Sequence, residues 1–199
     1  SMWHMRILVS RMDEERAELK QRRGARAYGF SKGWSTASVI GLLREARWCS
    51  VVWGRPLVVL AADIWRCFGR LRHEWLEWAM AQEGVQAWLR RAVMREYLGL
   101  QAFAKIQGSG YGEPFPFERG APTGRAEGPT LLNFLIQALM APLVTEWERN
   151  GYGFKLACEV DEPAEQAVRL THVRWADHCF LLAAGGQRGH RVLEDLTAA

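Results

Sequence analysis

Apolar and polar residues follow two different patterns in the first half of the chain, one helical and one strand-like. Ser35-Thr36 precedes an apolar run at helical spacing, residues 39–43, and Pro56 ends that segment. A continuous apolar run rich in β-branched residues follows at 57–62 and stops at Asp63. Such a run is typical of a buried strand. We therefore expect a capped helix after Ser35 and then a buried strand that ends at Asp63.

The rest of the chain continues this mixture of helices and short strands. Apolar residues at helical spacing predict a helix over 71–81, and we expect its Trp75 and Trp78 to lie in the protein core. A second helix is predicted from Val85 to Leu98. Further elements follow from turn residues and apolar runs: a Gly/Pro-rich loop or hairpin at 107–124, a helix from Pro129 to about Arg149, and strands at 153–160 and 169–183. The fold class expected is α+β, a small antiparallel sheet packed on helices.

Composition and charge place the chain among ordinary globular proteins. The 199 residues are 49% hydrophobic, enough for one domain with a proper core. The net charge is +4, but residues 1–55 carry a surplus of six basic residues and the remainder a surplus of two acidic ones. A basic N-terminal third suits a polyanionic partner, and a solvated helical face explains it equally well.

The cysteines and the apolar stretches indicate an intracellular protein. The four cysteines form no Cys-x-x-Cys pair and no zinc spacing, which favours free thiols in a reducing compartment. We see no secretion signal. The longest apolar stretch, residues 131–144, is too short to span a bilayer, so no membrane partner is expected.

Two aspartates are the candidates for chemistry. Asp63 ends the predicted strand, and Asp177 lies between two apolar stretches where a hairpin tip is expected. Carboxylates that converge across adjacent strands bind hard cations such as Mg²⁺ through oxygen. An aspartate at a strand end also caps a turn without any metal, and spacing alone leaves both interpretations open.

The residues around these aspartates resemble a known family. Residues 175–178 read Trp-Ala-Asp-His between the apolar stretches 170–173 and 180–182, and are similar to the Tyr-Ala-Asp-Asp signature of reverse transcriptases. Residues 60–68 read Leu-Ala-Ala-Asp-Ile-Trp-Arg-Cys-Phe, which resembles that family's first palm motif, an apolar strand followed by Asp-Ile-x-Lys-Ala-Phe-Asp.

Two further blocks carry the same resemblance. One block consists of residues 120–124, Gly-Ala-Pro-Thr-Gly, together with residues 129–133, Pro-Thr-Leu-Leu-Asn, which resemble Gly-x-x-Gln-Gly and Ser-Pro-x-Leu-Phe-Asn. Residues 28–36 resemble the fingers motif Gly-Phe-Arg-x-Gly-Arg-Ser-Thr. The four blocks stand in the family's order over residues 24–185. Together they are most similar to the group that contains non-LTR retrotransposons and group II introns.

The resemblance implies a fold, an activity and partners. The fold would be a right-hand polymerase palm with partial fingers, in which residues 1–55 are fingers-like, residues 56–199 are palm-like, and no thumb follows. The ancestral activity would be RNA-templated DNA synthesis by two-metal nucleotidyl transfer with Mg²⁺ or Mn²⁺. RNA template, DNA primer and dNTP would be the partners.

The resemblance also assigns roles to single residues. Asp63 and Asp177 would ligate the metal ions. Phe68 matches the aromatic residue that excludes a ribose 2′-hydroxyl, although an ordinary core phenylalanine is an equal alternative. Four residues would shape the substrate pocket: Gly120, Thr123, Gly124 and Asn133. Lys32 would meet phosphates, and the alternative is that it is only a surface charge.

Several functional positions depart from the family pattern. His178 stands where the second aspartate of the signature belongs, and an imidazole is a poor Mg²⁺ ligand compared with a carboxylate. Other departures replace an aspartate, the pocket glutamine, the serine before Pro129 and two fingers arginines: Gly69, Thr123, Gly128, Ser31 and Trp34. We therefore expect synthesis to be weakened or lost.

Two alternatives of other classes stay open. The chain would be a non-catalytic nucleic-acid-binding or interaction module that retains the palm fold, with Trp34 and Trp65 as stacking candidates, or a relic without function. Zinc bound by His172 and His178 with Cys158 or Cys179 is disfavoured, because the spacing matches no common zinc site.

Overall fold

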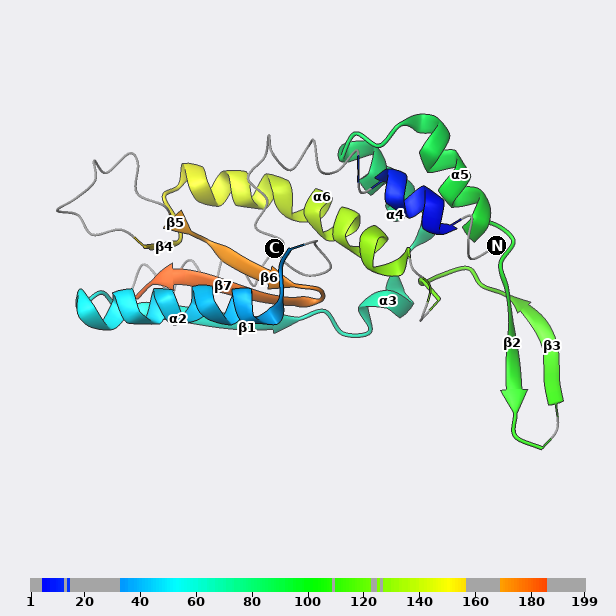
Figure 1. The fold of residues 1–199 in the computed structure, drawn as a ribbon, viewed down its shortest axis with the longest axis horizontal. Helices are drawn as coiled ribbons and strands as arrows, with labels where there is room; N and C mark the ends of the chain where they lie inside the picture. Colours follow the sequence, from blue (N-terminus) through cyan, green and yellow to red (C-terminus); the bar gives the residue numbers. More distant parts are fainter. Residues whose placement is uncertain are drawn as a thin grey trace. The chain divides into compact units, whose positions relative to one another are not determined.

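The computed structural model describes residues 5–12, 14, 33–108, 110–122, 125, 127–156 and 169–185 (Figure 1). Within these residues the fold is α+β, with small antiparallel sheets packed on helices. The chain forms two compact units that interleave in sequence: residues 1–24 with 66–139, and residues 25–65 with 140–199. The α+β expectation is confirmed. The predicted division at residue 55 into fingers-like and palm-like parts stays a prediction.

The unit formed by residues 25–65 and 140–199 contains the main sheet. Its strands β1, β7 and β6 pair antiparallel in the order β1-β7-β6, while β4 pairs only with β5. The elements are α2 (Thr36–Val52), β1 (Leu57–Asp63), β4 (Phe154–Lys155), β5 (Arg169–Leu170), β6 (His172–Trp175), β7 (His178–Ala184) and the C-terminal part of α6 (Gly128–Arg149).

Helix α2 begins at the expected cap and lies along the sheet (Figure 1). The backbone N–H of Ser35 donates to Ser38 Oγ at 3.2 Å, which satisfies a polar group at the helix start. Val39, Ala46 and Cys49 form the buried face of α2. They pack in one core with residues of the strands of this unit, among them Phe154, Val173 and Leu182. The predicted helix is confirmed, although Ile40 of its apolar run is 49% exposed.

Side chains alternate between the two faces of this sheet. Val173 on β6 and Leu182 on β7 belong to the core under α2. His172 and Leu181, the residues next to them in sequence, pair with each other across β6 and β7. Both are also buried, but on the opposite face of the sheet. There the ring of Trp147, in the C-terminal part of α6, meets His172 edge-on at 6.1 Å. The sheet is therefore covered on both faces at β6 and β7, which explains the unbroken apolar run of β7 after His178.

The prediction of a buried strand at 57–62 is correct for the strand and wrong for its burial. β1 ends at Asp63 as expected, but every residue of β1 is at least partly exposed, and Val59 is 43% exposed. Packing on its faces is the difference: β6 is also an edge strand yet is mostly buried, whereas Leu57 is the one residue of β1 found in the described core under α2.

The other unit is mainly helical. Residues 5–12 are helical and are followed, after residue 65, by α3 (Cys67–Arg70), α4 (His73–Gln82), α5 (Ala87–Tyr97), β2 (Gln101–Ile106), β3 (Gly110–Pro116) and the N-terminal part of α6. The N-terminal part of α6 is buried on all sides from residue 130 to 136. The buried apolar residues of this unit include Met5, Met12, Leu76, Met80, Leu89, Val93, Leu131 and Phe134. β2 and β3 form the hairpin that turn residues predicted, although it starts earlier in the sequence.

Helix α4 buries only part of the face that its apolar spacing predicts. Trp75 and Trp78 are 47% and 42% exposed, so their placement in the core was wrong. Leu76, Ala79 and Met80 are the buried residues of α4. The guanidinium of Arg72 lies 5.5 Å from the ring centroid of Trp75, a cation–π distance that suits an aromatic side chain at the surface.

Helix α6 starts and ends close to where the sequence places it. Gly128 is its first residue, just before Pro129, and Arg149 is its last. By length and composition α6 could cross a membrane, but half of its most apolar window is buried inside the protein. The core helix of a globular domain passes the same composition test. The described strands of the C-terminal third are those expected from 153–160 and 169–183, and residues 157–168 lie outside the described part.

Candidate functional site

The ladder between β1 and β7 places Asp63 and His178 side by side. Asp63 is the last residue of β1 and pairs with His178, the first residue of β7. Residues directly opposite each other on antiparallel strands project to the same face. Strand alternation puts both on the face that carries Leu57 and Phe180, next to the core under α2. Both side chains nevertheless stay more than half exposed.

The tight turn between β6 and β7 brings Asp177 to the same place. Trp175 pairs with His178, so Ala176 and Asp177 form a two-residue hairpin loop. Ala176 has φ 54°, a left-handed conformation that few non-glycine residues adopt. The carbonyl of Asp177 accepts a hydrogen bond from the N–H of Ile64 at 3.2 Å, which ties the turn to the end of β1.

The three side chains form one cluster. His178 Nδ1 lies 3.2 Å from Asp63 Oδ1, and His178 Nε2 lies 4.0 Å from Asp177 Oδ1. One ligand atom from each residue can be chosen so that all three lie within 4.8 Å of one another. The imidazole therefore stands between the two carboxylates. The convergence of Asp63 and Asp177, which spacing alone left open, is present in the structure.

The donor set of this cluster fits Mg²⁺ only in part. Two carboxylates are what a Mg²⁺ site in proteins commonly supplies, the remaining ligands being water and substrate oxygens. The imidazole does not fit, because Mg²⁺ takes oxygen ligands and imidazole suits the later transition metals. His178 therefore contributes a nitrogen donor next to both carboxylates, where an all-oxygen site would have a third oxygen ligand.

Other predicted site residues belong to the unit of residues 66–139. Phe68 is partly buried, and its ring lies next to Gly128, where an added Cβ would be 3.6 Å from the ring. Gly120 has φ +90°, and an added Cβ would lie 3.0 Å from the carbonyl oxygen of Phe68. The N–H groups of Gly120 and Ala121 donate to the carbonyls of Leu71 and Phe68 at 2.7 and 2.8 Å. The loop before α6 is thus fastened to the segment around Phe68.

The remaining predicted residues are buried or lie outside the described part. Asn133 is fully buried in α6, so it acts within the core rather than on an open surface. Lys32, Thr123 and Gly124 lie outside the described residues. Their suggested contacts with phosphates or with a templating base pair stay predictions.

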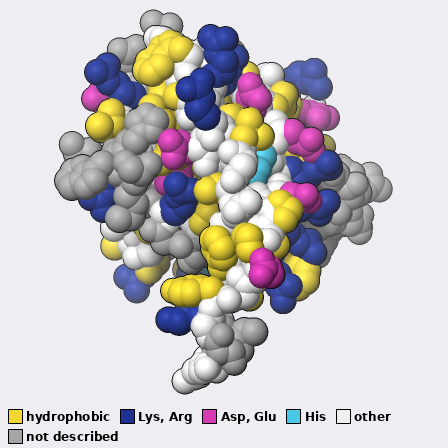
Figure 2. Space-filling view, turned by 90° about the vertical axis from the view of Figure 1, so that its right-hand side faces the viewer, with side chains coloured by type: hydrophobic (Ala, Val, Ile, Leu, Met, Phe, Trp, Pro, Cys, Tyr) yellow, Lys and Arg dark blue, Asp and Glu magenta, His cyan; other side chains and the backbone are white. Residues whose placement is uncertain are grey.

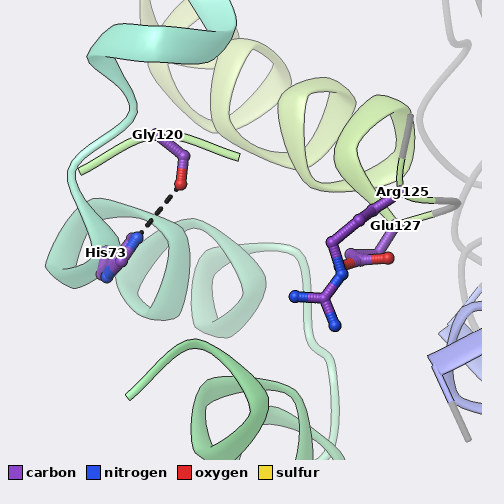
Figure 3. Close-up of polar contacts among 4 residues, drawn as sticks. All are labelled: His73, Gly120, Arg125 and Glu127. Atoms are coloured by element: carbon purple, nitrogen blue, oxygen red, sulfur yellow. Dashed lines mark hydrogen bonds and ion pairs between the residues drawn. The ribbon is translucent and has the colours of Figure 1, made fainter. Parts of the chain in front are cut away.

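Sequence reasoning missed a polar cluster beneath the loop before α6 (Figure 3). His73 Nε2 lies 3.1 Å from the carbonyl oxygen of Gly120, and Arg125 Nε lies 2.9 Å from the carboxylate of Glu127. The Glu127 carboxylate is almost fully buried. Tyr97 is also buried, and its ring centroid is 5.1 Å from that of His73. The position of Glu127 directly before Gly128-Pro129, where a helix starts, was the available signal.

Burial and charge act together on Tyr97 within this cluster. Burial raises the pKa of its phenol well above the ordinary range, and the Glu127 carboxylate raises it further. The Glu127 carboxylate is itself paired with Arg125, whose positive charge lowers the pKa of Tyr97 by a smaller amount. Tyr97 therefore stays neutral beside a buried carboxylate.

The structure also places the stacking and zinc candidates. Trp34 and Trp65 are 50% and 60% exposed. His172 is buried away from the Asp63 cluster, against Trp147. The three described cysteines are free thiols, and Cys158 lies outside the described residues. On the face drawn in Figure 2, apolar side chains lie among basic and acidic ones, without one continuous field of a single charge.

Comparison with known proteins identifies the fold. No protein-family model matches the chain, and no curated protein matches it. Solved structures do: apo telomerase from Candida tropicalis truncated from its C-terminal domain matches 98% of this chain with a TM-score of 0.68 at 11% identity. Telomerase from Candida albicans in complex with a fragment of telomeric RNA matches 94% of it with a TM-score of 0.63 at 12% identity. The fold is reverse-transcriptase-like.

This likeness is one of fold, since so few residues are identical. Telomerase is a reverse-transcriptase-related polymerase, and the chain spans about a third of the length of these telomerases, 37% and 32%. The reverse-transcriptase-like fold agrees with the family that the motifs resemble. The closer assignment to the non-LTR retrotransposon and group II intron group stays a prediction from the motifs.

Proposed function

We propose that this chain is the palm region, with partial fingers, of a retroelement-derived reverse-transcriptase-like protein that binds nucleic acid inside the cell and has weakened or lost DNA synthesis. RNA template and DNA primer would be its ligands, with dNTP as the substrate of any residual synthesis. The observation that carries the proposal is the contact of His178 Nδ1 with Asp63 Oδ1 at 3.2 Å. This contact supports a metal site inherited from a reverse transcriptase, in which a nitrogen donor has replaced one of the oxygen ligands.

Several features support nucleic acid as the ligand. The reverse-transcriptase-like fold is shared with a telomerase solved in complex with telomeric RNA. Trp65 lies two residues beyond Asp63 and is 60% exposed, so a base stacked on it would lie close to the carboxylates. Residues 1–55 carry the basic surplus that phosphates require.

Residual synthesis would depend on the ion supplied. Mg²⁺ is poorly served by the imidazole at position 178, whereas Mn²⁺ accepts carboxylates and tolerates nitrogen more readily. We therefore expect Mn²⁺ to support whatever extension remains. The non-catalytic module that retains the same fold is the alternative, and it predicts binding without extension in either ion.

Primer extension tests the catalytic half of the proposal. The purified chain would be given an RNA template, a DNA primer and dNTPs in Mg²⁺ or Mn²⁺, alongside Asp63→Ala and His178→Asp. We expect little or no extension by the wild-type chain in Mg²⁺, more by His178→Asp, and none by Asp63→Ala. Efficient extension by the wild-type chain in Mg²⁺ would contradict the proposed loss. No extension by folded His178→Asp would favour the binding module.

Binding to the same primer–template tests the other half. We expect affinity to fall linearly on a log–log plot against salt, as counterion release requires. Trp65→Ala should weaken binding roughly fivefold or more, because stacking of one base is worth about 1–3 kcal/mol. Trp88→Ala is the matched control, since Trp88 is 51% exposed but belongs to α5. Absence of binding at low salt, or equal losses in the two variants, would sink the proposed ligand.

A further inference from the structure

The cluster of Asp63, Asp177 and His178 has a donor set of its own. It offers two carboxylates and one imidazole, each from a backbone position that hydrogen bonds fix. Asp63 and His178 are partners in the β1–β7 ladder, and the carbonyl of Asp177 is bonded to the N–H of Ile64. Three protein ligands of mixed nitrogen and oxygen type, with remaining positions open to solvent, are the pattern of a reactive zinc-type site rather than of a Mg²⁺ site.

The separations allow one ion to be shared. Donor atoms that bind one tetrahedral ion at ordinary bond lengths lie roughly 3.3 Å apart. Asp63 Oδ1 lies 3.2 Å from His178 Nδ1, and one donor atom from each residue, with a single ring nitrogen from His178, can be chosen so that all three lie within 4.8 Å of one another. The 4.0 Å contact of Asp177 Oδ1 is with the other ring nitrogen, Nε2, which the same ion could not use together with Nδ1. Side-chain rotation alone can close the longer separations, because Asp63 and His178 are more than half exposed and Asp177 is a third exposed.

The chemistry of the third ligand sets the preference among ions. Imidazole favours zinc, cobalt and the other later first-row ions, and affinity for a given nitrogen and oxygen site is lowest for Mn²⁺ in that series. Mg²⁺ gains little from nitrogen and keeps its waters. Replacement of one carboxylate by imidazole at the end of β7 therefore changes which ion the site holds, not only how tightly it holds one.

We infer that Asp63, Asp177 and a ring nitrogen of His178 form a site selective for borderline divalent cations, with Zn²⁺ the reference member, over Mg²⁺. The inference rests on the proposed function in taking this site as the altered metal position of a reverse-transcriptase-like palm. It goes further by naming the class of ion. It also implies that the protein binds this ion in the absence of nucleic acid and dNTP.

Metal binding without nucleic acid is the test. The metal-free full chain would be titrated with Zn²⁺, Mn²⁺ and Mg²⁺ by calorimetry, and with Co²⁺ by its visible absorption. We expect one equivalent of Zn²⁺ and of Co²⁺, each bound more tightly than Mn²⁺, and Mg²⁺ bound most weakly. His178→Ala and Asp63→Asn should each weaken Zn²⁺ at least about tenfold, the lower end of what loss of even an outer-shell partner costs a metal site.

His178→Asp is the decisive variant, because it restores three carboxylates at an exposed position that tolerates substitution. We expect it to weaken Zn²⁺ and tighten Mg²⁺, which narrows or reverses the preference. Glu113→Gln, an exposed carboxylate of β3 outside the cluster, should leave both affinities unchanged. Folding of each variant would be checked by circular dichroism.

The opposite results overturn the inference. Zinc bound at cysteine thiolates would survive both His178→Ala and Asp63→Asn, and such survival, like a complete lack of zinc binding, sinks the site. An unchanged ratio of Zn²⁺ to Mg²⁺ affinity in His178→Asp does the same. The proposed function fails separately, in the RNA-binding and extension measurements, since the titrations contain neither RNA nor dNTP.

Discussion

Position 120 accepts only glycine, for two separate reasons. Its φ of +90° lies in a region that side-chain-bearing residues rarely adopt. An added Cβ would also stand 3.0 Å from the carbonyl oxygen of Phe68 and 3.2 Å from the Cα of Gly69. Both neighbours are backbone atoms, held by the hydrogen bond from Ala121 to Phe68, and cannot rotate away. The resemblance marked this glycine, and the structure supplies the reason for it.

Gly120→Ala should therefore destabilise the chain more than an alanine at an open glycine. Gly99 is the matched control, because its φ is +83° and no atom would meet an added Cβ there. We expect Gly99→Ala to cost about 1 kcal/mol from backbone strain alone, and Gly120→Ala to cost about 2–3 kcal/mol because the close contact adds to it. Urea denaturation followed by circular dichroism measures both. Equal losses would show that the loop can move away from Phe68.

At the same scale, some residues of the candidate site could be predicted from the sequence, but their arrangement in space could not. Asp63 and Asp177 were identified because each lies beside an apolar run, and the hairpin tip at Asp177 follows from the runs on either side. The position of the His178 ring between two carboxylates depends on strand register and rotamer, which spacing does not specify. Glu127 and Tyr97 were missed because their burial depends on how the loop before α6 packs.

Among whole elements, type was easier to predict than orientation. The strand ending at Asp63, the helices around α4 and α5, and the start of α6 all follow from periodicity, caps and turn residues. The exposure of β1 does not, because it depends on which elements pack against the faces of the sheet. The exposure of the two tryptophans of α4 was also missed, since tryptophan is apolar enough to suggest a core position and large enough to remain at the surface.

Substitutions on α4 test that orientation directly. Trp78→Gln should change the free energy of unfolding by no more than about 0.5 kcal/mol, as surface substitutions usually do. Leu76→Ala, two positions earlier on the buried face, should cost about 2–5 kcal/mol because it leaves a cavity. Denaturant unfolding of the two variants gives the comparison. A larger loss for Trp78→Gln than for Leu76→Ala would mean that α4 turns its tryptophans inward, as the sequence first suggested.

For the whole molecule, the interleaving of the two units matters most. The chain passes between them after residues 24, 65 and 139, so each unit is assembled from two separate segments. The last passage falls inside α6, whose N-terminal part belongs to one unit and whose C-terminal part belongs to the other. Helix formation is cooperative along the chain. We therefore expect the two units to unfold together.

A proline at the junction within α6 tests this coupling. Leu139→Pro removes one helical hydrogen bond and clashes with the preceding turn, at a cost of about 3 kcal/mol or more. Leu139→Ala is the control, because Leu139 is 47% exposed and alanine keeps the helix. Cys49 and Cys67 report on the two units separately, since each is a buried free thiol in a different one. Serines at positions 158 and 179 would leave these two as the only thiols to label.

Labelling of each thiol across a urea gradient then gives one midpoint per unit. In the control we expect the midpoints of Cys49 and Cys67 to coincide, as a single cooperative transition requires. In Leu139→Pro both midpoints should fall together, because the broken helix is shared and neither unit keeps its part of α6 intact. Burial raises the pKa of the Cys49 thiol, so its labelling is slow until unfolding exposes it. A fall at one cysteine alone would show that the units fold independently, and that α6 only joins them.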